Sequence, residues 1–168
     1  GIGSASCTVG GVTVAALVAA NPVGDVRADD GRVIAGARAA DGRGLLDSTR
    51  ALLAGNGPAP AMAAMTGLAG SATTIGVVAT DARLDKAQAS RLATLAHHGL
   101  SRAVSPLTQH DGDTLFALAT GGSGLAGELS LLGAMAADCV ARAIRHAVVH
   151  ATSLAEPAIP SARELGTA

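Results

Sequence analysis

The fold is decided by the stretch Gly70-Ser71-Ala72-Thr73-Thr74-Ile75-Gly76-Val77-Val78-Ala79-Thr80-Asp81. It begins with small residues typical of a loop and continues as a run of β-branched residues typical of a buried strand. Thr73 and Thr74 stand at this junction and are predicted to be the first residues of the strand. A hydroxyl placed there suits a chain that cleaves its own backbone and then uses the freed threonine as a nucleophile. An ordinary threonine-rich strand start is the alternative.

The composition limits both the core and the classes of function. The chain has 168 residues, enough for one domain with a real core, and Phe116 is its single aromatic residue. The core must therefore be built from Ala, Val, Leu and Ile. A net charge of -1, with no basic run and no Trp or Tyr, excludes nucleic-acid binding. No apolar run reaches the length of a membrane span, and no signal peptide is recognisable, so no membrane partner is expected.

Cysteines and histidines give no metal or cofactor pattern. Cys7 and Cys139 are far apart in sequence and lack metal-ligand spacing, which favours reduced, buried cysteines in a cytoplasmic protein. His146 and His150 share a helix face, but no third ligand is evident. The sequence therefore predicts neither a metal nor a cofactor.

The hydrophobic pattern predicts strands first and then strands alternating with helices. The expected elements are two strands within 5–20 around a Gly10-Gly11 turn, a strand over 32–36, a helix over 44–54, a linker over 55–72, a strand over 73–80, a helix over 81–104, a strand over 113–120 and a helix over 125–153. The second strand is nearly continuous in apolar residues, which predicts burial on both faces. This order favours helices layered on sheets, in an α+β or α/β plan.

The first residue is Gly1 and it leads almost directly into a strand. We therefore expect residues 1–168 to form a single domain that lacks upstream residues, which are either absent or present as a separate polypeptide.

A pair of acidic residues precedes the strand predicted over 113–120. Asp111 and Asp113 are separated by Gly112, so both carboxylates can point toward one pocket. Mutual repulsion and burial separate the pKa values of such a pair, so one carboxyl can hold a proton while the other stays ionised. A solvated turn is the alternative, because Asp and Gly are turn residues.

Asn21 ends the second predicted strand and is followed by Pro22. Its carboxamide could donate a hydrogen bond to a developing oxyanion. The alternative is a simple strand terminator, since Pro and Asn favour turns.

Together these blocks resemble one family of hydrolases. The matching segments are Thr73–Asp81, His97–Ala103 and Asp111–Gly121, with the upstream segments Gly1–Ala5 and Ala20–Gly24. They are similar to the L-aminopeptidase/D-esterase family, which also contains the β-peptidyl aminopeptidases and the nylon-oligomer hydrolase. The resemblance covers nearly all of the chain.

The resemblance implies an N-terminal-nucleophile hydrolase with an αββα sandwich, made as a precursor that cuts itself into two chains. Residues 1–72 would be the end of the first chain and residues 73–168 the second. Thr73 would become the nucleophile, and its freed α-amino group the general base. Members are usually homo-oligomers, so a homo-oligomer of the processed unit is expected here.

The resemblance also assigns roles to the other candidate residues. Asn21 matches the asparagine that stabilises the oxyanion. Asp111 and Asp113 match a polar or acidic pair near the nucleophile, and two aspartates are more similar to the nylon-oligomer hydrolase. The residue before the nucleophile is typically Asn, or Gly in the aminopeptidase branch, whereas this chain has Ala72.

The sequence thus predicts a self-processing amide hydrolase for small peptides or amide oligomers, cleaved between Ala72 and Thr73. One alternative is an acyltransferase that passes an acyl group from Thr73 to an amine. The other is an unprocessed or non-catalytic precursor, because an uncut chain has no free amine on Thr73. Pocket residues in the missing upstream segment would set the substrate.

Overall fold

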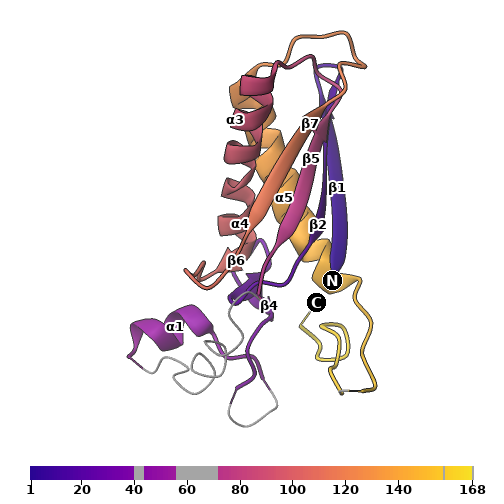
Figure 1. Ribbon diagram of the computed structural model, residues 1–168. Coiled ribbons are helices and arrows are strands. Elements are labelled where there is room, and N and C mark those ends of the chain that lie inside the picture. Colours follow the sequence, from indigo (N-terminus) through magenta and orange to yellow (C-terminus); the bar gives the residue numbers. More distant parts are fainter. Residues whose placement is uncertain (40–43, 56–71, 157, 168) are drawn as a thin grey trace.

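The computed structural model describes residues 1–39, 44–55, 72–156 and 158–167. Its main layer is a four-stranded sheet in the order β1-β2-β5-β7 (Figure 1). The strands are β1 (Ile2–Val9), β2 (Val12–Ala19), β5 (Ile75–Thr80) and β7 (Thr114–Ala119). β2 is antiparallel to both β1 and β5, whereas β5 and β7 run parallel.

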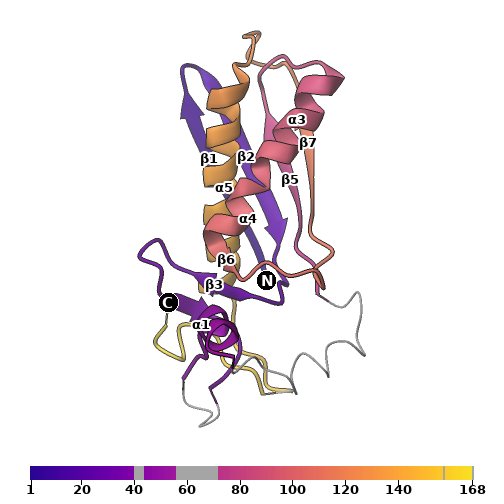
Figure 2. The ribbon, with the colours of Figure 1, turned by 90° about the vertical axis from the view of Figure 1, so that its left-hand side faces the viewer.

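A helical layer covers one face of this sheet. It consists of α3 (Lys86–Ala96), α4 (His98–Ala103) and the long α5 (Leu129–Val149). In Figure 2 these helices lie side by side in front of the strands. None of the described helices is long and apolar enough to cross a membrane.

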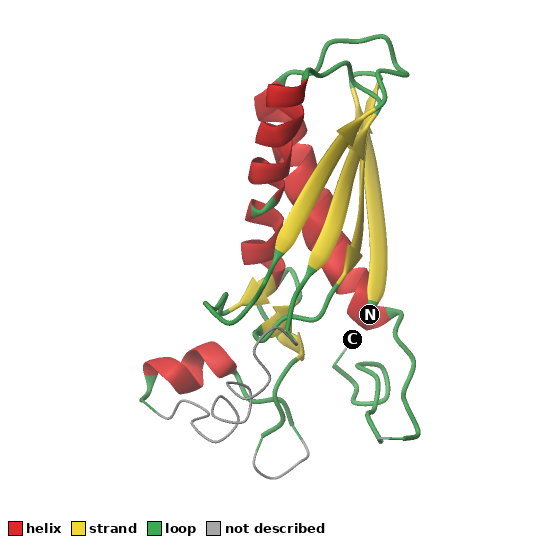
Figure 3. Ribbon diagram, viewed as in Figure 1, coloured by secondary structure: helices red, strands yellow, loops and turns green. Residues whose placement is uncertain are grey.

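A smaller sheet lies at one end of the molecule. It has the order β4-β3-β6, with β3 (Asp25–Arg27), β4 (Val33–Ala35) and β6 (Val104–Ser105). The short helix α1 (Ser48–Leu53) follows β4 in the chain and occupies part of the helix predicted over 44–54. Most of the linker predicted over 55–72 lies outside the described residues. The α+β class is confirmed, and Figure 3 shows the helices and strands segregated into layers.

The first hairpin forms where the Gly10-Gly11 pair predicts it. Both glycines have positive φ, 59° and 80°, which is the backbone of a two-residue turn matched to strand twist. Glycine also allows β1 to approach α5 closely, because a Cβ on Gly3 would lie 2.0 Å from the carbonyl oxygen of Ala143. The glycine and alanine content therefore serves close packing between sheet and helix.

The second strand, predicted to be buried on both faces, is buried on only one face among the described residues. Val14 and Val18 of β2 point into the helical side and are fully buried, but Leu17 on the opposite face is 52% exposed. The strand register places Leu17 beside Val77 of β5, which in turn lies beside Phe116 of β7, 59% exposed. Within the described residues the helices thus cover one face of the four-stranded sheet, and its other face is an uncovered apolar surface.

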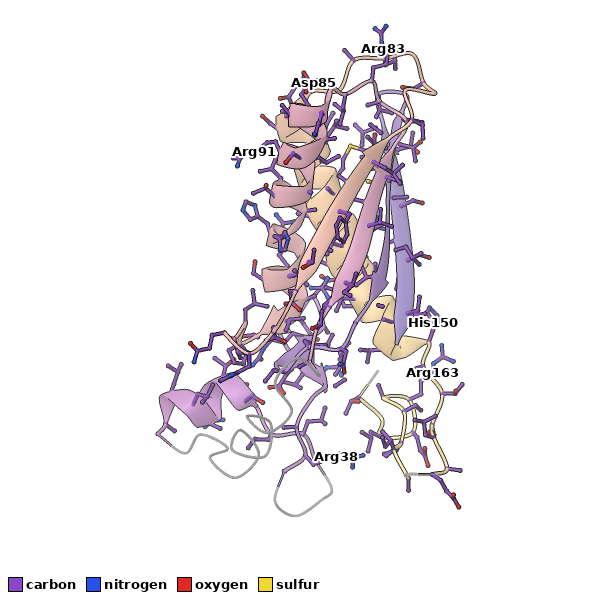
Figure 4. The ribbon with its side chains drawn as sticks, in the orientation of Figure 1. Arg38, Arg83, Asp85, Arg91, His150 and Arg163 are labelled. Atoms are coloured by element: carbon purple, nitrogen blue, oxygen red, sulfur yellow. The ribbon has the colours of Figure 1, made fainter. Side chains whose placement is uncertain are left out.

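The helix predicted over 81–104 begins later and is broken once. Asp85 lies at the start of α3 (Figure 4). It accepts a hydrogen bond from the Gln88 N–H, while the Gln88 side chain accepts one from the Asp85 N–H. This capping box fixes the start of α3, and α4 follows after His97. The last helix likewise begins only after Glu128, whose carboxylate accepts from Ser130 and Leu131 N–H groups. Capping residues therefore shorten both predicted helices.

Replacing Asp25 with alanine is expected to destabilise the protein strongly. Asp25 is fully buried and accepts hydrogen bonds from the Ser48 N–H (2.6 Å), the Ser48 hydroxyl (2.8 Å) and the Ala37 N–H (3.3 Å). Alanine leaves these buried donors without an acceptor, at a cost of about 2–4 kcal/mol in the free energy of unfolding. Urea unfolding measures this value. The matched control is Asp30→Ala, since Asp30 is exposed and its loss should cost less than about 0.5 kcal/mol.

Candidate active site

The candidate nucleophile lies just before a central strand. β5 begins at Ile75, so Thr73 and Thr74 precede the strand, and the prediction that they are its first residues is wrong. Thr73 is half-buried, and its hydroxyl donates a hydrogen bond of 2.6 Å to the carbonyl oxygen of Ala72. The hydroxyl therefore lies against the peptide group that self-cleavage would break.

Strand pairing brings the other candidates to Thr73. Ile75 pairs with Ala19 near the end of β2 and with Thr114 at the start of β7. Because β2 is antiparallel and β7 parallel to β5, the residues after β2 and before β7 flank the residues before β5. Asn21 is among them, and its backbone oxygen accepts a 2.9 Å hydrogen bond from the Thr73 N–H.

Asp113 contacts the residue that follows Thr73, the candidate nucleophile. Its Oδ1 accepts a 2.7 Å hydrogen bond from the Thr74 N–H. Burial raises the pKa of Asp113 above its ordinary value of 3.8, and the negative charge of Asp111 adds to the increase. His97 acts in the opposite direction, as a nearby positive charge would. The charge of Asp111 thus acts on Asp113, whereas the sequence prediction that both carboxylates point toward one pocket stays a prediction.

Asp111 joins two loops. Its Oδ1 accepts from the Val23 N–H at 2.8 Å, after β2, and its Oδ2 accepts from the Thr108 hydroxyl at 2.7 Å. The two carboxylates therefore have different partners. Asp111 links the loop after β2 to the loop before β7, while Asp113 binds the backbone of Thr74, just before β5. Thr108 was not singled out in the sequence, because a hydroxyl in a loop matches no motif.

The backbone N–H of Gly112 belongs to the candidate site, although the sequence indicates Gly112 only as a spacer between the two aspartates. Its N–H donates a 3.2 Å hydrogen bond to the Ala72 oxygen, the same atom that accepts from the Thr73 hydroxyl. A Cβ at this position would lie 2.9 Å from Thr73 Oγ1. Glycine here therefore supplies a donor to the candidate scissile carbonyl and leaves room for the hydroxyl beside it.

Thr74 differs from Thr73 although the two are adjacent. Its side chain is fully buried, and among the described residues its hydroxyl has no hydrogen-bond partner. The Thr74 hydroxyl lies near the Asp113 carboxylate and lowers its pKa slightly. The two groups do not meet the geometry of a hydrogen bond. The half-buried Thr73 hydroxyl, and not that of Thr74, lies against a peptide carbonyl.

These residues lie in a fold of the N-terminal-nucleophile hydrolase type. Over 99% of this chain, the structure resembles an L-aminopeptidase D-Ala-esterase/amidase from Ochrobactrum anthropi, described as a variant of the Ntn hydrolase fold. The TM-score is 0.63, the identity 21%, and the match covers 46% of that chain. A β-aminopeptidase from Burkholderia sp. is 26% identical with a TM-score of 0.65, over 99% of this chain and 47% of that one.

The chain belongs to peptidase family S58, whose family model matches residues 1–158. An uncharacterized aminopeptidase of Mycobacterium leprae is 38% identical over 175 residues, covering 92% of this chain and 46% of the relative. The chain thus spans about half the length of that relative. The resemblance to the aminopeptidase family inferred from the sequence blocks is confirmed. The roles of individual site residues stay predictions.

The pH dependence of stability tests the environment of Asp113. The folded protein binds a proton on Asp113 at a higher pH than the unfolded chain does. This carboxyl therefore stabilises the fold below pH 3.8 and loses that contribution as pH rises through its raised pKa. We expect the Tm of the wild type, minus that of Asp113→Asn, to increase as pH falls through this range. Parallel Tm curves for the two proteins would contradict the assignment. Asparagine is a suitable substitute because its side-chain oxygen can still accept the hydrogen bond from the Thr74 N–H.

Proposed function

We propose that this chain carries the self-processing and catalytic centre of an amide hydrolase whose nucleophile is Thr73. One observation carries the proposal. The Ala72 carbonyl oxygen accepts hydrogen bonds from the Thr73 hydroxyl at 2.6 Å and from the Gly112 N–H at 3.2 Å. A nucleophile and an oxyanion donor thus converge on one peptide group, as acyl transfer requires.

In the first reaction Thr73 Oγ attacks the carbonyl carbon of Ala72 and loses its proton. The carbonyl oxygen takes up the negative charge, which the Gly112 N–H stabilises. The bond between the Ala72 carbon and the Thr73 nitrogen then breaks, and the nitrogen takes up the proton as it leaves. Water hydrolyses the resulting ester, which frees the Ala72 carboxylate, the Thr73 hydroxyl and the Thr73 amine.

Substrate hydrolysis would use the same groups after the cut. In the intact chain the Thr73 nitrogen is an amide that donates to the Asn21 oxygen, so it is not basic. A free α-amino group has a pKa of roughly 7.7–8.0, so the amine of Thr73 could accept the proton of the Thr73 hydroxyl. Asn21, next to Thr73, would donate a hydrogen bond from its carboxamide N–H to the substrate oxyanion. Asp111 and Asp113 would keep the loops and the strand start in place.

The face of the four-stranded sheet that points away from the helices is uncovered among the described residues. It carries exposed apolar side chains on three strands, among them Leu17, Ile75, Phe116 and Leu118. Exposed apolar surfaces of this kind normally mark an interface. We propose that a further segment of the protein covers this face to complete the αββα sandwich and the substrate pocket. A cytoplasmic homo-oligomer acting on small peptides or amide oligomers completes the proposal.

Intact mass after incubation near neutral pH tests the proposal. We expect two fragments, one of which begins at Thr73 by N-terminal sequencing. The cut protein is then assayed with aminoacyl amides and nylon oligomers, with and without an amine acceptor. An acylated acceptor in place of free acid would indicate an acyltransferase. A chain that stays whole and inactive would be a trapped or non-catalytic precursor, and full activity of an uncut chain would refute the role of the Thr73 amine.

A further inference from the structure

The fold brings together two cysteines that lie 132 positions apart in the sequence. Cys7 of β1 and Cys139 of α5 are free thiols, and their sulfur atoms are 3.6 Å apart. Cys139 is fully buried, whereas Cys7 is only partly buried. The sequence predicts two buried cysteines, which is correct for Cys139 and wrong for Cys7, and their proximity could not be foreseen from their spacing.

The groups around this pair argue against a metal ion. Asp138 has a carboxylate oxygen within 4.8 Å of both sulfurs, so the three residues form a possible ligand set. However, the Arg142 guanidinium donates to Asp138 Oδ2 at 2.8 Å and lies 3.6 Å from Cys139 Sγ. It also donates to the Ser6 carbonyl at 3.0 Å, which fixes it in place. The Arg142 cation thus already pairs with the carboxylate and contacts the buried sulfur.

We propose that Cys7 and Cys139 are an oxidisable dithiol that closes to an intramolecular disulfide linking β1 to α5. The proposal is independent of the hydrolase function. A disulfide has a sulfur–sulfur distance of about 2.05 Å, so the two sulfurs must approach by only about 1.5 Å. The two sulfur atoms are already in contact.

The different exposure of the two thiols sets the order of the reaction with a peroxide. The Cys7 thiolate attacks one peroxide oxygen, the O–O bond breaks, and Cys7 becomes a sulfenic acid as the other oxygen leaves as hydroxide. The Cys139 thiolate then attacks the Cys7 sulfur, forming the S–S bond and releasing hydroxide. Both sulfurs are oxidised, and the protons of the two thiols convert both hydroxides to water.

The environment of Cys139 fits the second step and not the first. Burial, and then the contact with Cys7, raises the pKa of the Cys139 thiol, so it is a poor first target. Its sulfur is nevertheless held against Cys7, which compensates for a small thiolate fraction. The nearby Arg142 favours the thiolate as it forms.

The disulfide would fasten an edge of the sheet. β1 has a single neighbour, β2, in the described four-stranded sheet, so its free side lacks strand pairing. A covalent link to α5 removes the freedom of β1 to separate from the helix and restricts the unfolded chain. We therefore expect a higher Tm and slower hydrogen exchange in β1 after oxidation.

The test is to treat the purified protein with hydrogen peroxide and to count free thiols in urea. We expect both thiols to be lost in the monomer, with a mass decrease of about 2 Da, and both to return with dithiothreitol. Peptide mapping should recover a peptide pair joined through Cys7 and Cys139. Cys7→Ser and Cys139→Ala are matched controls, and neither should show the mass decrease or the higher Tm.

Three results would overturn the proposal. The first is retention of both thiols under conditions that oxidise a reference dithiol. The second is loss of thiols through disulfide-linked dimers or through a sulfinic acid on Cys7 alone. The third is stoichiometric binding of Zn²⁺ that both cysteine substitutions abolish, which would make the pair part of a metal site.

Discussion

Replacing Thr73 with valine is expected to leave the chain uncut and to lower amide hydrolysis by at least about 10³-fold. Valine has nearly the same shape, but a methyl group replaces the hydroxyl that lies against the Ala72 carbonyl. Neither the ester nor any later acyl intermediate can then form. Thr73→Ser keeps the hydroxyl and should retain both cleavage and hydrolysis. Intact mass over time and an aminoacyl amide assay measure the two reactions.

The adjacent threonine provides a matched control. Thr74→Val makes the same chemical change one residue away, where the hydroxyl has no hydrogen-bond partner among the described residues. Removing a buried hydroxyl without a partner costs little, so stability and cleavage should stay near wild type. Two results would show that Thr73 is not the nucleophile. One is cleavage of Thr73→Val at the wild-type rate, and the other is loss of cleavage in Thr74→Val while Thr73→Val is still cut.

Elements that form through contacts between residues close in sequence, such as the first hairpin and the strand β5, were predictable from local sequence signals. The Gly10-Gly11 pair predicts a hairpin turn because both positions need positive φ. The β-branched run from Ile75 predicts the central strand. The start of α3 was missed although the Asp85–Gln88 capping box is present in the sequence, because the apolar spacing extends farther toward the N-terminus.

Other features depend on tertiary contacts that local patterns do not contain. β3 (Asp25–Arg27) is a three-residue strand, too short for a visible alternation. β2 is apolar on both faces, but the described structure covers only the face of Val14 and Val18. An apolar pattern records which surfaces avoid water in the complete protein, so it cannot tell which segment covers them.

The candidate site was predictable in part. The sequence blocks pointed to Thr73 and Asn21 and to the two aspartates, and strand pairing brings all four together. The Gly112 N–H was missed because every residue except proline carries a backbone donor, and only the fold determines where it points. The packing of Gly112 against Thr73 was equally invisible in the sequence.

That packing predicts a second large effect, on the rate of self-cleavage. In Gly112→Ala the new Cβ would lie 2.9 Å from Thr73 Oγ1 if nothing moved. The Thr73 hydroxyl is the atom that can move most easily, since rotation about one side-chain bond takes it away from both the new methyl group and the Ala72 carbonyl. Displacement of a reacting atom by about 1 Å costs roughly 10²-fold in rate, so we expect at least that decrease.

Gly122 offers the matched control at the other end of β7. A Cβ added to Gly122 would have Thr120 Oγ1 as its nearest neighbour, at 3.4 Å, so Gly122→Ala should cleave at the wild-type rate. Circular dichroism and Tm establish that both variants are folded. Wild-type cleavage by folded Gly112→Ala would show that the space beside Thr73 is unimportant.

A double substitution separates loss of space from loss of the Gly112 donor. Thr73→Ser in the Gly112→Ala background removes the threonine Cγ2, which would lie 3.8 Å from the new methyl group. Serine has wider rotamer freedom than threonine, so its hydroxyl can return toward the Ala72 carbonyl. We expect the double variant to cleave faster than Gly112→Ala alone. If it does not, the alanine has moved the backbone N–H instead, and the defect lies in stabilisation of the oxyanion.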